Sequence, residues 1–329
     1  MRKKSSFIFY ATGVLLLIVA FVLIWALLNR DWLTDWWRGK DYQPVGEMGR
    51  IMQDLKLTDR GEFLFRASWP ALNSRDDFNT NCRSVLNEET AVLGCYTNNN
   101  IYVYNIESAE LDGIRELTTA HELLHAVWRR MSVEERNKLT EELKVVYEQN
   151  KDRLEEEIGT YDESEQQEEL YVRAGTEIKK LTDNLEKHYA EIFTEQDLVV
   201  SYYDKYIAVF KEIEADMNNL KAEMDDLDDS ISALTDEYER RIKQLDAGIV
   251  SFNACAEVAG CFTTEEQFNT RRNGLLTERA LLEDIYNQIN DLIASYNDKV
   301  EKYNSDVTRT QHLNEVMNSN KKVDELPAE

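Results

Sequence analysis

Hydrophobic residues at alternating steps of three and four run through residues 203–245, and this pattern limits the possible folds more than any other feature of the chain. Only Arg241 interrupts the pattern over six heptads, which indicates a coiled-coil seam on a long α-helix. The seam positions are Tyr203, Tyr206, Phe210, Ile213, Met217, Leu220, Met224, Leu227, Ile231, Leu234, Tyr238 and Leu245.

A second run follows the same rule less strictly over residues 268–317. We predict that the two runs form an antiparallel helical hairpin over residues 196–318, with a tip loop at 249–263 and arms of about 75 Å. Gly248 is expected to end the first helix and Thr264 to cap the second. Two separate intermolecular coiled coils are the alternative. The polar residues in the second seam are Arg271, Glu278, Lys299, Asp306 and Thr310.

Residues 41–110 have a mixed pattern that predicts a small α/β region. "GRIMQDLKL" is typical of a short helix, and "EFLFRAS" is interpreted as a strand before Pro70. "AVLGCYT" and "IYVYNI" are rich in β-forming residues, and the three asparagines between them predict a hairpin. From Leu111 onward the sequence is mostly helical. Ser132 and Glu135 have the spacing of a capping box, which predicts a helix that ends near Gly159, and a further helix begins near Ser164.

The amino-terminal segment has no charged residue between Ser5 and Asn29, and Phe7–Leu28 is long enough to span a bilayer as a helix. We predict a single-pass anchor here, with a cleaved signal peptide as the alternative. The chain carries a formal charge of −25, and residues 1–30 contain four basic residues and no acid, so the remainder carries −29. A surface this negative repels phosphate backbones, which argues against nucleic-acid binding.

All four cysteines follow the anchor, an even number that fits two disulfides in an oxidising compartment. Local pairs Cys82–Cys95 and Cys255–Cys261 are the economical choice among three pairings, and free buried thiols are the alternative. Basic residues flank the anchor equally, so the cysteines decide the predicted orientation. We expect a cell-membrane protein with a cytoplasmic amino terminus and an extracytoplasmic bulk.

The sequence "TTAHELLHAVW" places His121 and His125 four residues apart, so that both imidazoles lie on one face of a helix and can bind one zinc ion. Glu122 lies beside the first ligand, where it can act as general base on a water bound to that zinc. His188 and His312 are the only other histidines, and both lie in or beside the long helical region. A carboxylate from a following helix is therefore the better candidate for the third ligand.

"HELLH", followed 44 residues later by "EELYVRAGTE", resembles the gluzincin group of zinc metallopeptidases, in which the third ligand is a glutamate on a second helix. The resemblance implies Glu169 as this ligand, with Glu168 as the alternative. Thermolysin-like members carry an aspartate four residues after the ligand, where this chain has Arg173, so the minimal gluzincins are the nearer match. "FNTNC", "LGCY" and "IYVYNI" also resemble segments of uncharacterised membrane-anchored bacterial HExxH proteins.

The same resemblance implies that "NNNIYVYNI" forms the cleft edge and pairs with an extended substrate, although an ordinary buried strand is nearly as consistent with it. Tyr161 is either a donor to the reaction oxyanion or a turn residue after Gly159.

These patterns together predict an α+β chain that is a membrane-anchored zinc metalloendopeptidase with one Zn²⁺ ion and peptide or protein substrates. The alternative is a surface scaffold or adhesive coiled-coil protein with a degenerate or structural zinc site. A protein partner at the hairpin is a further expectation. The predicted parts are a cytoplasmic tail and anchor (1–30), a juxtamembrane linker (31–45), a zincin-like domain (46–195), the hairpin (196–318) and a disordered tail (319–329).

Overall fold

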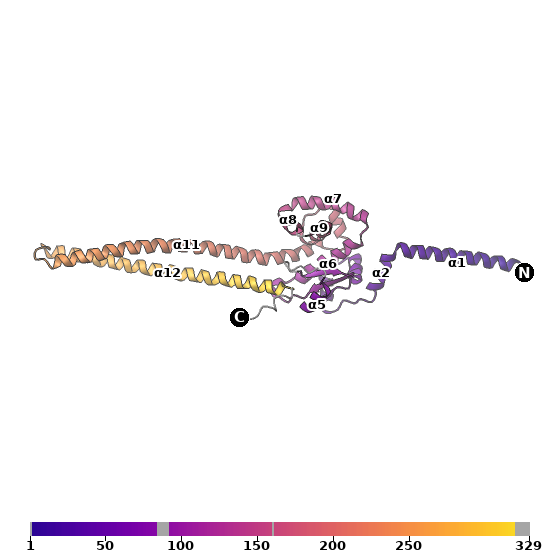
Figure 1. Ribbon diagram of the computed structural model, residues 1–329, viewed down its shortest axis with the longest axis horizontal. Coiled ribbons are helices and arrows are strands. Elements are labelled where there is room, and N and C mark those ends of the chain that lie inside the picture. Colours follow the sequence, from indigo (N-terminus) through magenta and orange to yellow (C-terminus); the bar gives the residue numbers. More distant parts are fainter. Residues whose placement is uncertain (1, 84–91, 160, 320–329) are drawn as a thin grey trace. The chain divides into compact units, whose positions relative to one another are not determined.

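A computed structural model describes residues 2–83, 92–159 and 161–319 (Figure 1). The predicted tail therefore lies, from residue 320 onward, outside the described residues. Two compact units divide the chain: one combines Met1–Val209 with Asn314–Glu329, and the other is Phe210–Leu313. The described chain is mostly helical and has one small sheet, as the predicted α+β class requires.

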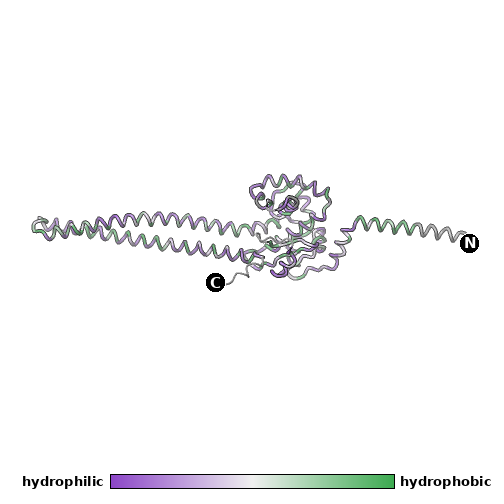
Figure 2. Tube along the Cα trace, viewed as in Figure 1, coloured by the Kyte–Doolittle hydropathy of each residue, from purple (hydrophilic) through white to green (hydrophobic). Residues whose placement is uncertain are grey.

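The amino-terminal segment forms α1 (Arg2–Leu28) and α2 (Arg30–Gly39). Among the described residues no single helix is long and apolar enough to cross a membrane, but Val14–Leu28 and Arg30–Gly39, bent by 77°, satisfy length and composition as a pair. Figure 2 shows the hydrophobic stretch of α1 that precedes α2. Residues 31–45, predicted to be a linker, instead contain most of α2, which packs against α4.

The mixed region begins with α3 (Gly46–Asp54), as predicted for "GRIMQDLKL", and continues with α4 (Asp59–Ala67) and α5 (Arg75–Asn81). The strand predicted for "EFLFRAS" was wrong, because this segment forms most of α4. Thr58 caps the helix by accepting a hydrogen bond from the Gly61 amide at 3.0 Å. Leu64 and Phe65 are buried against the core, and this burial outweighs the strand propensity of the phenylalanines.

A three-stranded sheet has the order β1-β3-β2, with β1 (Ala71–Asn73), β2 (Gly94–Thr97) and β3 (Asn100–Tyr104). The predicted hairpin of β2 and β3 is confirmed, and the turn residues Asn98 and Asn99 have φ values of 51° and 60°. Asparagine tolerates this left-handed region better than most residues, which explains the asparagine run. β1 was not predicted and pairs in parallel with β3. A disulfide joins Cys82 to Cys95 in β2, as predicted.

After the sheet the described chain continues with the short helices α6 (Ile114–Arg130), α7 (Val133–Gln149), α8 (Lys151–Gly159), α9 (Glu163–Glu177) and α10 (Asp183–Tyr189). The capping box of Ser132 and Glu135 is present at the start of α7. The single helix predicted from there to Gly159 is two helices, because the Asn150 backbone leaves the helical conformation, with φ of −125° and ψ of 23°, and its side chain bonds back to the Val146 carbonyl at 2.8 Å. α6 contacts both the sheet strands and α9, so it lies within the core of this unit.

The predicted helical hairpin is formed by α11 (Gln196–Ala256) and α12 (Glu265–Met317), which run side by side in Figure 1. Thr264 caps α12 by accepting from the Gln267 amide, and the Cys255–Cys261 disulfide closes the tip. Gly248 was wrongly expected to end the first helix. A Cβ at that position would lie 2.9 Å from a Leu275 methyl carbon, so this glycine allows the two helices to approach closely.

The polar interruptions of the two seams meet across the hairpin. Arg241 donates to Glu278 at 3.0 Å, and Arg271 donates to Ser251 at 2.8 Å. Paired polar side chains at seam positions fix the register of a coiled coil at some cost in stability. This intramolecular pairing is the antiparallel arrangement that the heptads predicted.

Candidate metal centre

Helix α6 positions three of the predicted site residues. Its first turn starts at Gly113, whose φ of 92° favours glycine. Ala120, Leu124 and Val127 are buried, which fixes the rotation of the helix about its own axis. His121 and His125 consequently share another side of the helix, with ring centroids 5.1 Å apart. Glu122 is 5% exposed.

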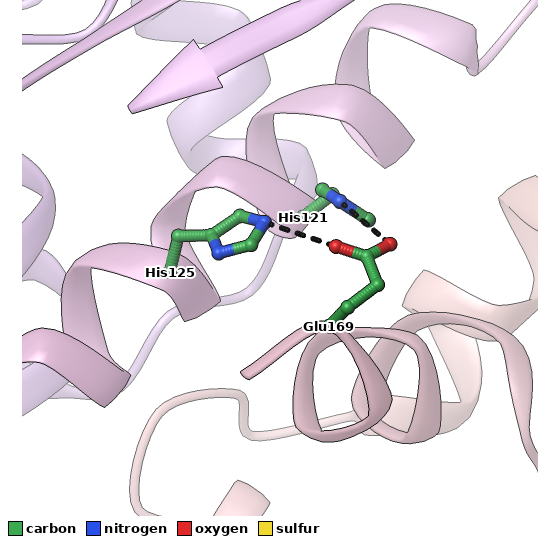
Figure 3. A group of neighbouring side chains, drawn as sticks. All are labelled: His121, His125 and Glu169. Atoms are coloured by element: carbon green, nitrogen blue, oxygen red, sulfur yellow. Dashed lines mark ion pairs between the residues drawn. The ribbon is translucent and has the colours of Figure 1, made fainter. Parts of the chain in front are cut away.

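The third group comes from α9, which presents Glu169 to both histidines (Figure 3). His121 Nε2 lies 3.7 Å from Glu169 Oε1, and His125 Nε2 lies 3.5 Å from Glu169 Oε2. These separations exceed an ordinary N–H···O hydrogen bond of about 2.9 Å. They are close to the roughly 3.3 Å between two ligands of a tetrahedral zinc ion with bonds of about 2 Å. The Glu169 side chain is 2% exposed, so a carboxylate is held here away from water.

Glu168, the alternative third ligand, lies on the other ring nitrogen of His125. Its Oε1 is 2.8 Å from His125 Nδ1 and also accepts from Arg129 Nε at 3.2 Å. An ionised carboxylate only accepts, so Nδ1 carries a proton and Nε2 is the nitrogen directed at Glu169. A carboxylate behind a histidine in this way is the usual support of a metal ligand.

Arg173 occupies the position where thermolysin-like proteins carry an aspartate, and it supports Glu169 directly. Its Nε donates to Glu169 Oε1 at 2.7 Å, and its Nη1 donates to Glu177 at 3.0 Å and also to Glu157. Arg153 of α8 makes a second ion pair with Glu177 at 3.0 Å. The guanidinium of Arg173 therefore fixes the carboxylate oxygen of Glu169 that lies nearest to His121.

Burial dominates the electrostatics of the site. It raises the pKa of Glu122 to about 7 and lowers the pKa of His121 to about 3. Burial opposes the charge of His125 as well, but the hydrogen bond with Glu168 and the nearby carboxylate of Glu169 raise the pKa of His125 to about 10. For Glu169 burial works in the upward direction, yet the charges of His121, His125 and Arg173 hold its pKa well below the usual range.

The network around the two helices contains five carboxylates, three guanidinium groups and the imidazole of His125. Burial raises the pKa of Glu122 and of Glu177 to about 7, so full ionisation of the five carboxylates is opposed, and a divalent cation would favour it. The carboxylates belong to Glu122, Glu157, Glu168, Glu169 and Glu177, and the guanidinium groups to Arg129, Arg153 and Arg173.

Glu122 lies against the sheet edge rather than in open space. A Cβ added to Gly94 would come within 2.6 Å of Glu122 Oε1, so only glycine fits at this point of β2. β2 is an edge strand of the described sheet, whereas β3, the core of "NNNIYVYNI", is central. The expectation that "NNNIYVYNI" forms the cleft edge was therefore wrong, since β3 is paired on both sides. Of the two edge strands of the described sheet, β2 is the one that lies beside Glu122 of α6.

The outward groups of β2 follow from its pairing. Tyr104 donates to Leu93, and Cys95 pairs with Tyr102, so the intervening Gly94 and Tyr96 direct their backbone N–H and C=O away from β3. Sequence reasoning missed Gly94, although a lone glycine before a β-rich run is a signal for close backbone approach.

The two other histidines and Tyr161 lie outside the His121–His125–Glu169 group found among the described residues. His188 is hydrogen-bonded to the Tyr171 hydroxyl at 3.0 Å, and His312 is likewise not part of that group. The Tyr161 hydroxyl is in hydrogen-bonding contact with Glu169 and Arg173. Burial, and to a smaller extent the charge of Glu169, raise the pKa of Tyr161 to about 12. This position favours a supporting role for Tyr161 near the third ligand.

Comparison with known proteins gave no match: no protein-family profile, curated protein or solved structure is significantly similar to this chain.

Proposed function

We propose that the chain is a zinc metallopeptidase that hydrolyses peptide bonds, with His121, His125 and Glu169 as the metal ligands and Glu122 as the general base. One observation carries the proposal: a buried carboxylate faces two histidine nitrogens at ligand–ligand distances, with a second buried carboxylate beside them. A purely structural site would have no use for Glu122.

The donor set of two imidazoles and one carboxylate fits zinc, which commonly keeps a fourth position open for water in catalytic sites. A zinc ion held there would supply Lewis-acid polarisation of the scissile carbonyl and lower the pKa of a coordinated water. Glu168 and Arg173 would orient His125 and Glu169 and keep the three donors in place.

Glu122 would move the proton in the reaction. As a carboxylate it accepts a proton from the water oxygen that attacks the peptide carbonyl, and it then delivers this proton to the amine nitrogen when the C–N bond breaks. Burial raises the pKa of Glu122 in the metal-free protein, and a raised pKa makes a carboxylate a stronger base than an exposed glutamate.

The open edge of β2 would bind the substrate main chain. Gly94 and Tyr96 present backbone donors and acceptors, and an extended peptide added there as a strand would pass alongside Glu122. Because main-chain hydrogen bonds would align the substrate, we expect the protein to cleave many different sequences within unstructured segments.

We further propose that Phe7–Leu28 anchors the chain in a cell membrane and that the disulfide-bonded bulk is extracytoplasmic. The two disulfides support an oxidising compartment.

The test compares the full-chain protein with Glu122→Gln and with Glu141→Gln, a matched change on the exposed face of α7. Bound zinc is measured by mass spectrometry, and cleavage is measured on a mixed library of unstructured peptides. We expect both variants to bind zinc like the parent, and Glu122→Gln to lose cleavage by about 10²–10⁴-fold. Equal cleavage by Glu122→Gln would refute the assignment, and zinc binding without cleavage by the parent would favour the scaffold alternative.

A further inference from the structure

Helix α2 combines a face fixed to the metal-site unit with a face of exposed tryptophans. On the fixed side, Arg130 at the end of α6 makes a bidentate pair with Asp35 at 2.8 and 2.9 Å, and these side chains are 16% and 12% exposed. Gly39 packs on the Ala67 backbone, where a Cβ would come within 3.1 Å. Breaking a buried ion pair is costly, so this pair and the close contact of Gly39 hold α2 against the unit.

Further contacts join α2 to the end of α4. Arg38 Nε donates to the Ala67 carbonyl at 3.0 Å, and the indole N–H of Trp69 donates to the Arg38 carbonyl at 2.8 Å. Trp32 borders this side: it stacks on Phe63 with ring centroids 6.3 Å apart and leaves half of its surface exposed. The ion pair and the hydrogen bonds occupy one side of the helix.

The other side of α2 is apolar and exposed. Trp32, Trp36 and Trp37 are 50%, 49% and 65% exposed, and the Lys40 ammonium lies 5.8 and 5.0 Å from the ring centroids of Trp36 and Trp37. Indole rings flanked by a basic side chain are typical of the bilayer interface, where the rings occupy the headgroup level and the amine extends to water.

The occupant of this face follows from its continuity with the preceding segment. Only Asn29 separates α2 from α1, whose residues 14–28 are uncharged and largely exposed apolar side chains. We propose that the tryptophan face of α2 (Trp32, Trp36 and Trp37) docks on the phospholipid interface and holds the metal centre next to the membrane, so that the substrates are juxtamembrane segments of other membrane proteins.

The distance can be bounded from the fold. Arg130, which binds α2, is five residues from His125 and nine from His121 on the same helix, or about 8 and 14 Å at 1.5 Å per residue. Adding the length of the ion pair and the diameter of α2 to the longer of these two distances places the metal centre at most about 30 Å from the lipid surface. An extended peptide covers that distance in about ten residues. The substrate assignment rests on the proposed peptidase function, whereas the docking of α2 does not.

Docking is tested with nitroxide labels on the full chain in phosphatidylcholine nanodiscs. All four native cysteines are in disulfides, so Trp36→Cys and Asp31→Cys each give one reactive thiol. Asp31 is nearer to the anchor but lies about 140° around the helix from Trp36, and its side chain is 90% exposed. We expect the label at 36 to collide with oxygen and be shielded from a nickel complex, and the label at 31 to show the reverse. Equal accessibility at both positions would overturn the docking.

The substrate class is tested with two single-span peptides that carry the same unstructured cleavage sequence. One places this sequence within ten residues of the bilayer, and the other separates it by a 40-residue helical spacer of about 60 Å. We expect at least tenfold faster Glu122-dependent cleavage of the proximal substrate. Equal rates, or cleavage of a free peptide alone, would overturn the juxtamembrane assignment while the peptidase stands. No Glu122-dependent cleavage of any substrate would overturn the peptidase and the substrate class together, and the labels would still decide the docking.

Discussion

Replacement of Arg173 by methionine tests whether this guanidinium holds the third ligand in place. The methionine keeps an unbranched apolar stem but removes the guanidinium group and its charge. In the variant, the three carboxylates that share the Arg173 guanidinium in the parent would face one another without a counter-charge. Those of Glu169 and Glu177 are only 2% and 6% exposed. One such contact at about 4 Å is worth about 4 kcal/mol at the effective dielectric of a protein.

The expected loss of metal-free stability is about 3–5 kcal/mol, the usual cost when one partner of a buried ion pair is removed. Part of the lost stability should return on addition of zinc, because the ion supplies positive charge to Glu169. Loss of a supporting contact to a metal ligand typically weakens affinity by about 10–100-fold. Urea unfolding with and without zinc, and competition against a chromogenic chelator, measure these two quantities.

Two controls separate charge from geometry. Arg173→Lys keeps the charge but cannot reach several carboxylates at once, so it should retain most of the stability and still bind zinc more weakly. Lys144→Met removes an exposed ion pair with Glu141 and should change stability by less than about 0.5 kcal/mol. A folded Arg173→Met protein whose zinc affinity lies within twofold of the parent would refute the supporting role.

Three further substitutions test other parts of the structure. Glu168→Gln should weaken zinc binding by about 10–100-fold, measured by chelator competition, because His125 loses its charged partner. Burial raises the pKa of Glu177 to about 7, so in metal-free protein this group destabilises the fold as pH rises from 4.5 to 7. The stability of Glu177→Gln relative to the parent should therefore rise by up to about 1.4 kcal/mol per pH unit in urea titrations across that window, and a flat difference would contradict the shift. Joint replacement of Arg241 and Glu278 by leucine should raise the thermal midpoint of the hairpin, and a lower midpoint would show that the pair stabilises it.

The sequence allowed prediction of those features that depend on spacing along one chain segment. The heptads predicted α11 and α12, the histidine spacing placed two nitrogens on one face of α6, and the asparagine run predicted the β2–β3 turn. Local cysteine pairing was also correct. In each case the residues that carry the sequence pattern also form the predicted feature, so no knowledge of tertiary packing was required.

The errors concern features that depend on partners distant in sequence. The "EFLFRAS" segment is helical because Gly61 packs on the Ile192 carbonyl, about 130 residues away, and the core selects the helical face. β3 became central because β1, which is only three residues long, pairs on its second edge. Gly248 lies within α11 rather than at its end, and its missing side chain makes room for Leu275 of α12.

The choice between Glu168 and Glu169 shows the same limit at the site. Adjacent helical residues differ by about 100° around the axis, and the acidic run before them does not indicate which side faces α6. Tyr171 and Val172 decide it, because both are fully buried and thereby set the rotation of α9. With this rotation Glu169 is directed between the histidines, and Glu168 lies behind His125.

The charge balance of the site couples the proposed metal to the stability of the unit. Without a cation, the burial of Glu122 and Glu177 raises the pKa of both groups to about 7, which shows that their ionisation is opposed in this environment. A bound divalent ion relieves that opposition for Glu122 and stabilises only the folded chain, by about 2.7 kcal/mol at a hundredfold excess over its dissociation constant. α6 carries two of the three proposed ligands, His121 and His125, and also makes the Arg130–Asp35 pair with α2. Loss of the metal would therefore loosen the same helix that attaches the unit to α2.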